Sequence, residues 1–190
     1  MKINGLTALV TGANRGLGNA FVQALRDAGC TKIYAAARTI EGAACDAVVE
    51  PVQLDITKIG QVSSAATRCH DVSILINNAG VARFAPALGA PTMDNARLEI
   101  ETNYLGTLAM CRAFAPVLKR NGGGALVNIL SVVSFFNAPM QGSYCASRVL
   151  PEKNESGGIP LRARIRFKNR TGRQASMRWG SRIQRICVSA

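Results

Sequence analysis

The pattern of apolar and polar positions over residues 1–147 predicts strands and helices in alternation. Five short apolar runs are typical of buried strands: "TALVTG", "KIYAAAR", "VVEPVQLDIT", "SILINNAG" and "GGGALVNILS". Three longer segments carry apolar residues at helical spacing: "LGNAFVQALRDAGC", "IGQVSSAATRC" and "MDNARLEIETNYLGTLAMCRAFAPVLKR". Strands that alternate with helices predict an α/β fold whose parallel sheet is covered on both faces.

This regular pattern ends near residue 148. The segment "PEKNESGGIP" is polar and turn-forming, "LRARIRFKNR" alternates apolar with basic residues, and the last twenty residues show no clear period. We therefore predict a folded domain at residues 1–148 and a basic, poorly ordered tail at 149–190. The charge follows the same division, because eleven of the 23 Lys and Arg residues lie from Arg148 onward.

Composition narrows the class of protein. A chain of 190 residues with 48% hydrophobic residues fits one domain with a real core, and its apolar runs are too short for a membrane span. The first residues lack the features of a signal peptide. Six cysteines without C-x-x-C spacing and a single histidine, His70 in a turn, argue against a metal site or a disulfide framework. We expect reduced thiols and a cytoplasmic location.

The stretch "TGANRGLG" at residues 11–18 follows the first strand and opens the first helix. Gly12, Gly16 and Gly18 allow a tight turn and a close approach of the backbone to a pyrophosphate. The N-terminus of the helix then offers free N–H groups and the positive end of its dipole. The strand before and the helix after this turn favour a dinucleotide-binding site.

Further motifs follow in order. The chain has "NNAG" at 77–80, "TNYLG" at 102–106, "NILS" at the end of the fifth strand, and a tyrosine thirteen residues after Ser131. With "TGANRGLG", these motifs resemble the short-chain dehydrogenases/reductases over residues 1–148. The resemblance implies a Rossmann-type, doubly wound parallel sheet of strand order 3-2-1-4-5. The sixth and seventh strands of the family are not visible, so we expect a C-terminally truncated fold.

The end of the second strand distinguishes NAD from NADP in many dinucleotide enzymes, since an acidic residue there binds the ribose and a basic one accommodates the 2′-phosphate. Here the strand ends at Arg38 with no carboxylate, which predicts NADP rather than NAD. The alternative is that Arg38 is a solvated loop residue. By resemblance, the cofactor would contact Gly12, Asn14, Arg15, Gly16, Leu17, Gly18, Arg38, Asp55, Asn78, Ala79 and Gly80.

The resemblance also implies a catalytic set. Ser131 would hydrogen-bond the substrate oxygen, Tyr144 would exchange its proton during hydride transfer, and Asn103 would hold a water in a proton relay. The family has a lysine four residues after the tyrosine, where this chain has Arg148. That spacing places Tyr144 and Arg148 on one helix face. Arginine keeps the charge, but its planar fork is larger and more directional than an ammonium.

The implied function is NADP-dependent oxidation or reduction of a small-molecule alcohol or carbonyl. Pro151 would end the Tyr144 helix early, and a short helix is marginal in isolation. The alternative function is therefore an inactive dinucleotide-binding protein or a non-functional truncated product. Loss of one A from a Lys codon AAG before a G would give Arg148 and shift the frame of everything downstream. The helix that pairs subunits in the family would be cut short.

The tail allows one other interpretation. "LRARIRFKNR" could contact nucleic-acid phosphates through its basic residues, with Phe167 and Trp179 stacking on bases. Charge alone gives such non-specific affinity, so we favour a solvated tail without a nucleic-acid or membrane partner. A poorly covered fifth strand would be an exposed sheet edge, and we expect low solubility.

Overall fold

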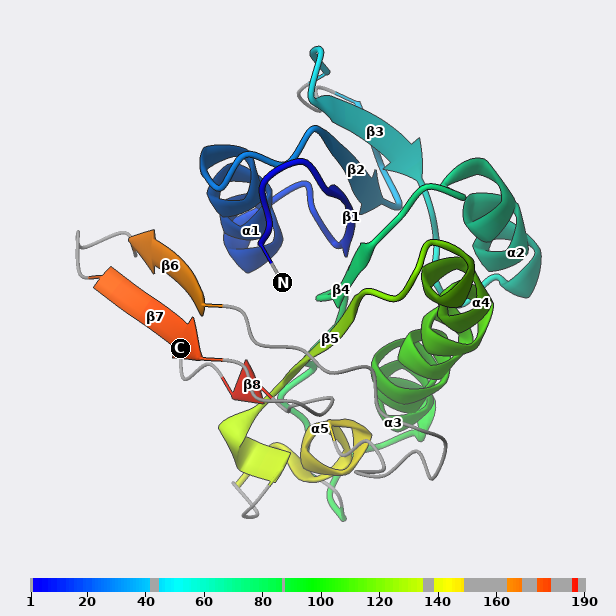
Figure 1. Ribbon diagram of the computed structural model, residues 1–190. Helices are drawn as coiled ribbons and strands as arrows, with labels where there is room; N and C mark the ends of the chain where they lie inside the picture. The colour runs from blue at the N-terminus through cyan, green and yellow to red at the C-terminus, as the bar shows by residue number, and fades with distance from the viewer. Residues whose placement is uncertain are drawn as a thin grey trace.

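The computed structural model describes residues 2–41, 45–86, 88–134 and 139–148, and the backbone of three short strands beyond them. Up to residue 130 strands and helices alternate as the sequence predicts, except that β3 follows β2 with no helix described between them (Figure 1). The strands are β1 (Thr7–Thr11), β2 (Lys32–Ala37), β3 (Val49–Gln53), β4 (Ile74–Asn77) and β5 (Ala125–Leu130). The helices are α1 (Gly16–Asp27), α2 (Ile59–Arg68), α3 (Asp94–Glu99), α4 (Thr107–Arg120) and α5 (Gly142–Ser147), with η1 (Ile100–Gly106) and η2 (Val132–Ser134).

The sheet has the order β3-β2-β1-β4-β5-β8. Its first five strands are parallel to their neighbours, which confirms the predicted order 3-2-1-4-5. Leu9 at the centre of β1 lies opposite Tyr34 of β2 on one side and Leu75 of β4 on the other. All parallel strands end at one edge of the sheet, so the loops that follow β1, β2 and β4 meet there.

Alternate residues of β1 face two separate cores, one on each side of the sheet. Ala8 and Val10 pack with Phe21 of α1, whereas Leu9 packs with Phe114 of α4. Figure 1 shows α1 on one face of the sheet and α2 and α4 on the other. This two-sided burial is the reason that the strands are continuous apolar runs in the sequence.

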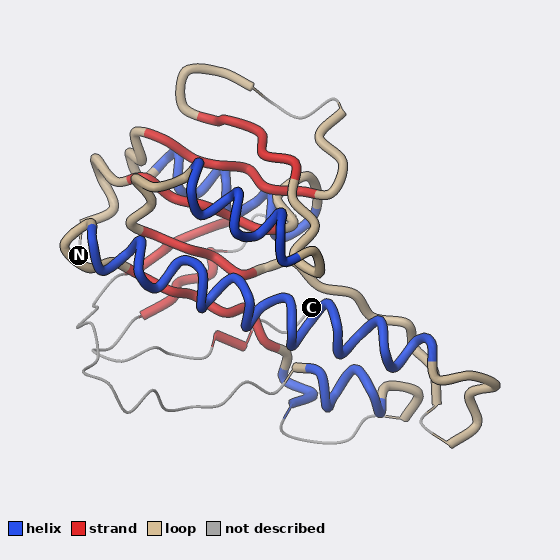
Figure 2. Tube along the Cα trace, turned by 90° about the vertical axis from the view of Figure 1, so that its right-hand side faces the viewer, coloured by secondary structure: helices blue, strands red, loops and turns tan. Residues whose placement is uncertain are grey.

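The long helix predicted from Met93 to Arg120 forms as one continuous helical stretch (Figure 2), which consists of α3, η1 and α4 in succession. Its middle segment, η1, is π-helical and contains Asn103. Pro116 is accommodated within α4. Short π-helical stretches inside α-helices are frequent at functional sites, because they shift the direction of the side chains.

The helix that carries Tyr144 is short. α5 has six residues and ends at Ser147, and Leu150 and Pro151 lie outside the described residues. Among the residues that are described, no helix is both long and apolar enough to cross a bilayer.

The region after residue 148 differs from the expectation in one respect. We assigned no strands there, but the structure describes β6 (Arg164–Lys168), β7 (Gln174–Arg178) and β8 (Ile186–Cys187). β6 and β7 pair antiparallel, and β8 pairs with the end of β5 over two residues. The alternation of apolar and basic residues at 161–170 is also the period of a strand, which explains the error. The remaining residues of the tail lie outside the described part, so their poor order stays a prediction.

Candidate active site

Two glycines at the turn between β1 and α1, Gly12 and Gly18, leave little room for a side chain. Gly12 has a φ of 65°, and a Cβ there would lie 3.0 Å from the Cα of Ala79. A Cβ on Gly18 would overlap the carbonyl oxygen of Gly12 and the side-chain amide of Asn78. The glycines therefore bring α1 and the loop after β4 directly onto the turn, and leave its backbone open to a ligand.

Thr11 fastens the loop after β4 to this turn. Its buried hydroxyl accepts hydrogen bonds from the backbone N–H groups of Asn78 and Ala79, both at 3.0 Å. The side-chain amide of Asn78 donates to the carbonyl oxygens of Thr11 at 3.0 Å and Gly12 at 3.2 Å. We call residues 11–18 and 78–80 together the cofactor cradle. Thr11 was not among the predicted site residues, although its position between a strand and Gly12 was the available signal.

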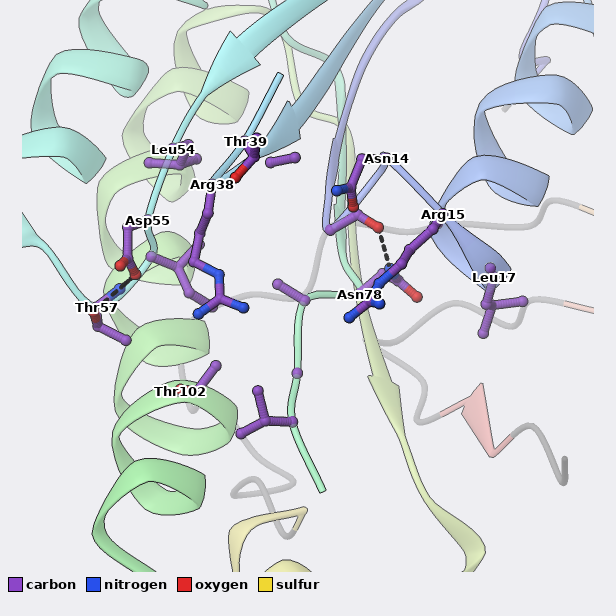
Figure 3. Close-up of a pocket in the computed structure, with 18 of the residues that line it drawn as sticks. Asn14, Arg15, Leu17, Arg38, Thr39, Leu54, Asp55, Thr57, Asn78 and Thr102 are labelled. Carbon is purple, nitrogen blue, oxygen red and sulfur yellow. Dashed lines mark hydrogen bonds between the residues drawn. The ribbon is translucent and has the colours of Figure 1, made fainter. Parts of the chain in front are cut away.

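A cavity of about 600 Å³ opens beside the cradle, at the carboxyl ends of the strands. Figure 3 shows Asn14, Arg15, Leu17 and Asn78 on one side of it and Arg38, Asp55, Thr57 and Thr102 on the other. All of the residues predicted to contact a cofactor line it: Gly12, Asn14, Arg15, Gly16, Leu17, Gly18, Arg38, Asp55, Asn78, Ala79 and Gly80. The remaining lining residues were missed: Ala37, Thr39, Leu54, Ile56, Thr57, Val81, Leu98 and Thr102.

The charges of this cavity suit an anionic ligand. Arg15 and Arg38 are exposed, and neither forms an ion pair within the described part of the chain. No acidic residue occupies the first turn of α1, and no side chain caps it, so its N–H groups remain available to an anion. This donor set fits a phosphorylated dinucleotide. The described residues contain no cluster of His, Cys, Asp or Glu that could hold a metal ion.

Asp55 is the acidic residue of the cavity. Burial raises the pKa of this carboxyl, but hydrogen bonds from Thr57 and the positive charges of Arg38 and Lys58 outweigh burial and hold the pKa below its ordinary value. Its Oδ1 accepts from the Thr57 backbone at 3.0 Å and from the Thr57 hydroxyl at 2.8 Å. The group is therefore ionised near neutral pH and fixed beside Arg38.

None of the four predicted catalytic residues lines the cavity, but Asn103 and Arg148 each contact a residue that does. Asn103 is buried, and its amide exchanges two hydrogen bonds of 2.8 Å with the backbone of Val81, a cavity residue. The same amide donates to the hydroxyl of Ser147 at 2.8 Å, and that hydroxyl donates to the carbonyl oxygen of Tyr144 at 2.8 Å. Asn103 thus connects the cavity wall with α5. Both of its amide hydrogens are donated to protein atoms.

Arg148 reaches from the Tyr144 helix to the cradle. Its Cζ lies 5.1 Å from the centroid of the Tyr144 ring, which confirms that the two side chains share one face. The guanidinium donates to the carbonyl oxygen of Ile129 at 3.3 Å and packs against the Cα of Gly80. Its Nε is buried without a hydrogen-bond partner.

Ser131 is half-buried just after β5, and its carbonyl oxygen accepts a hydrogen bond from the backbone N–H of Ser134 at 3.0 Å.

Comparison with known proteins agrees with this arrangement of elements. Residues 6–149 match the family model described as short chain dehydrogenase. The chain belongs to the short-chain dehydrogenase family. A solved short-chain dehydrogenase from Burkholderia cenocepacia, in complex with NADP, is 46% identical, with a TM-score of 0.75 over 78% of this chain and 62% of that one. Another, from Burkholderia phymatum in complex with NAD, is 28% identical with a TM-score of 0.70 over 78% of this chain and 57% of that one.

Among curated proteins, galactitol 2-dehydrogenase of Agrobacterium fabrum is 31% identical over 157 residues. The match covers 78% of this chain and 61% of that enzyme. The chain therefore spans less than two thirds of these relatives. The family match ends at residue 149, which agrees with the predicted end of the resemblance near residue 148.

Proposed function

We propose that this short-chain dehydrogenase binds NADP(H) in the cavity and transfers hydride between the nicotinamide and a small-molecule alcohol or carbonyl. The observation that carries the proposal is the convergence of all the predicted cofactor residues on one cavity. Bound NADP(H) would supply the hydride donor or acceptor. The glycine turn would hold its pyrophosphate at the N-terminus of α1, and Arg38, assisted by Arg15, would favour a 2′-phosphate.

In this proposal Tyr144 exchanges a proton with the substrate oxygen, and Ser131 hydrogen-bonds that oxygen. Asn103 holds the loop after β4 and α5 in register through Val81 and Ser147. Arg148 provides the positive charge beside the tyrosine. The similarity to galactitol 2-dehydrogenase supports a polyol or the corresponding ketone as the class of substrate. The cytoplasmic location stays a prediction.

A second candidate function is binding of the dinucleotide without turnover. Two observations favour it: Arg148 stands in place of the lysine with its Nε unpaired, and α5 has only six residues. Both candidates share the cofactor cradle and differ only in the chemistry at Tyr144.

A paired experiment distinguishes the two candidates. NADPH and NADH are titrated by fluorescence, and turnover is then measured with a panel of polyols and ketones. Tighter binding of NADPH, with turnover that Tyr144→Phe abolishes, supports the oxidoreductase. Binding with no turnover supports the second candidate. If neither dinucleotide binds, both candidates fail.

A further inference from the structure

A buried carboxylate lies outside the cavity and has no part in the function proposed above. Glu99, the last residue of α3, is 1% exposed. One of its oxygens accepts a hydrogen bond from the backbone N–H of Arg83 at 2.6 Å, and the other accepts from the hydroxyl of Ser143 at 2.6 Å. Burial of a carboxylate is costly unless both oxygens are bonded. Glu99 meets this condition by joining two segments that are distant in the sequence.

The same arrangement recurs four residues later. Asn103 bonds the backbone of Val81 and the hydroxyl of Ser147, as Glu99 bonds the backbone of Arg83 and the hydroxyl of Ser143. Each connection joins one residue of the long helix, one backbone position of the loop after β4 and one serine of α5. We call them the Glu99 and Asn103 connections. Figure 2 shows α5 beside the end of the long helix where both residues lie.

These two connections fix the helix that carries Tyr144. α5 is too short to be stable alone, and its N-terminus has no side-chain cap. Tyr144 lies between Ser143 and Ser147, and the Ser147 hydroxyl also holds the carbonyl oxygen of Tyr144. An apolar side chain in place of Glu99 would leave the Ser143 hydroxyl and the Arg83 N–H without their partner. The position therefore requires an acceptor, and not merely a group that fills space.

We propose that Glu99 is a positioning residue: through Ser143 it holds α5, and so Tyr144, against the loop after β4. This inference rests on the proposed function in one respect, namely that Tyr144 exchanges the proton with the substrate. The positioning itself is a property of the fold and can be measured without turnover.

The test is amide hydrogen exchange in the full chain, followed in α5 and in the strands β1 and β4. Ser143→Ala and Glu99→Ala each remove the Glu99 connection, and the exchange of α5 amides is expected to rise by about tenfold or more. Exchange in β1 and β4 should not change. Glu99→Gln should restore most of the protection, because its carbonyl can accept from Arg83 and its amide can donate to Ser143.

Tyr34→Phe is the matched control. It removes a hydrogen bond of 2.8 Å from Tyr34 to Asp71, on the face of the sheet that packs against α2 and α4, and does not touch α5 or the cavity. If Ser143→Ala leaves α5 exchange unchanged, or changes it no more than Tyr34→Phe does, the proposal is overturned. If Glu99→Ala does not fold, Ser143→Ala and Glu99→Gln decide the question.

Kinetics separate this proposal from the proposed function. Neither Glu99 nor Ser143 lines the cavity, so NADPH affinity should remain within about twofold in both variants. Where the chain turns over, kcat should fall about tenfold with KM for NADPH unchanged. A chain with no turnover contradicts the proposed function, while selective opening of α5 would still support the role of Glu99. A loss of NADPH binding equal to the loss of kcat would overturn that role.

Discussion

The cofactor cradle and the Tyr144 helix meet at the same edge of the sheet but are stabilised in different ways. The cradle is formed by backbone and short side chains. Thr11 at the end of β1 and Asn78 just after β4 hydrogen-bond each other, and α1 starts directly on the turn. The Tyr144 helix is six residues long and depends on side chains from elsewhere, Glu99 and Asn103 above all. Two short sequence motifs, "TGANRGLG" and "NNAG", mark both parts of the cradle, whereas no motif marks Glu99 and its contacts with the Tyr144 helix.

Breaking the cradle is expected to have the largest effect. Gly18→Ala places a Cβ against the carbonyl oxygen of Gly12 and the amide of Asn78, so the turn must open. Overpacking of this kind costs about 1–3 kcal/mol in the free energy of unfolding. Loss of two N–H contacts to a phosphate, at about 1.5–3 kcal/mol each, should weaken NADPH binding by about 100-fold or more. Chemical denaturation and NADPH titration measure the two effects.

Gly60→Ala is the control for this substitution. Gly60 lies in α2, where a Cβ meets nothing within 4 Å, so alanine should stabilise the chain by about 0.5–1 kcal/mol and leave binding unchanged. Equal effects of the two substitutions would show that the turn does not need Gly18, and the description of the cradle would be wrong.

The second prediction concerns Arg148, which stands beside Tyr144 where the family has a lysine. Arg148→Lys replaces the guanidinium that packs on Gly80 with a compact ammonium and removes the unpaired Nε. Since small errors of placement reduce rates strongly, we expect kcat/KM to rise by about tenfold. Arg148→Met, which keeps the length without the charge, should abolish turnover. A fall in kcat/KM for Arg148→Lys would mean that the arginine is already adapted to this site.

The difference between the two regions also explains what could be predicted from the sequence. The strands and the glycine turn could be predicted from apolar runs and glycine spacing, which are local in the sequence. The strand order and the cradle residues after β4 came from the resemblance of short, ordered motifs to a family. Glu99 was missed because its partners lie 16 and 44 residues away, and a single acidic residue in a helix gives no local signal. The π-helical register around Asn103 was missed for the same reason, since propensities do not specify it.

The strands beyond residue 148 were missed for another reason. The alternating apolar and basic residues of β6 fit both a strand and a charged tail, and β7 and β8 lie in the segment without a clear period.

The third prediction concerns Arg38 and the preference of the cavity for NADPH over NADH. Arg38→Ala removes a charge from the cavity and is expected to weaken NADPH binding by about tenfold, with little change for NADH. Arg120→Ala removes an exposed charge at the C-terminal end of α4 and should affect neither dinucleotide. Parallel titrations of both variants measure the preference. If NADH binds as tightly as NADPH to the unchanged chain, the assignment of NADP fails.

The smallest expected effect is that of Asp55→Asn on stability. This substitution removes the charge of the Asp55 carboxyl and nearly keeps its shape. Asn keeps an acceptor for the Thr57 N–H and hydroxyl but carries no charge, so Asp55→Asn tests the ionised carboxyl alone. The pKa of Asp55 is lowered from an ordinary value of 3.8 by Thr57, Arg38 and Lys58, against the opposing effect of burial. A lowered folded-state pKa gives stability that is present above the unfolded pKa and is lost as pH falls through the folded one.

The Tm of the unchanged chain should therefore exceed that of Asp55→Asn from pH 5 to 7 by a small margin, about 1–3 °C. The difference should shrink as the pH falls below about 4, where the carboxyl takes up a proton. A Tm difference that stays constant down to pH 3 would mean that shape, not charge, holds Asp55 beside Arg38.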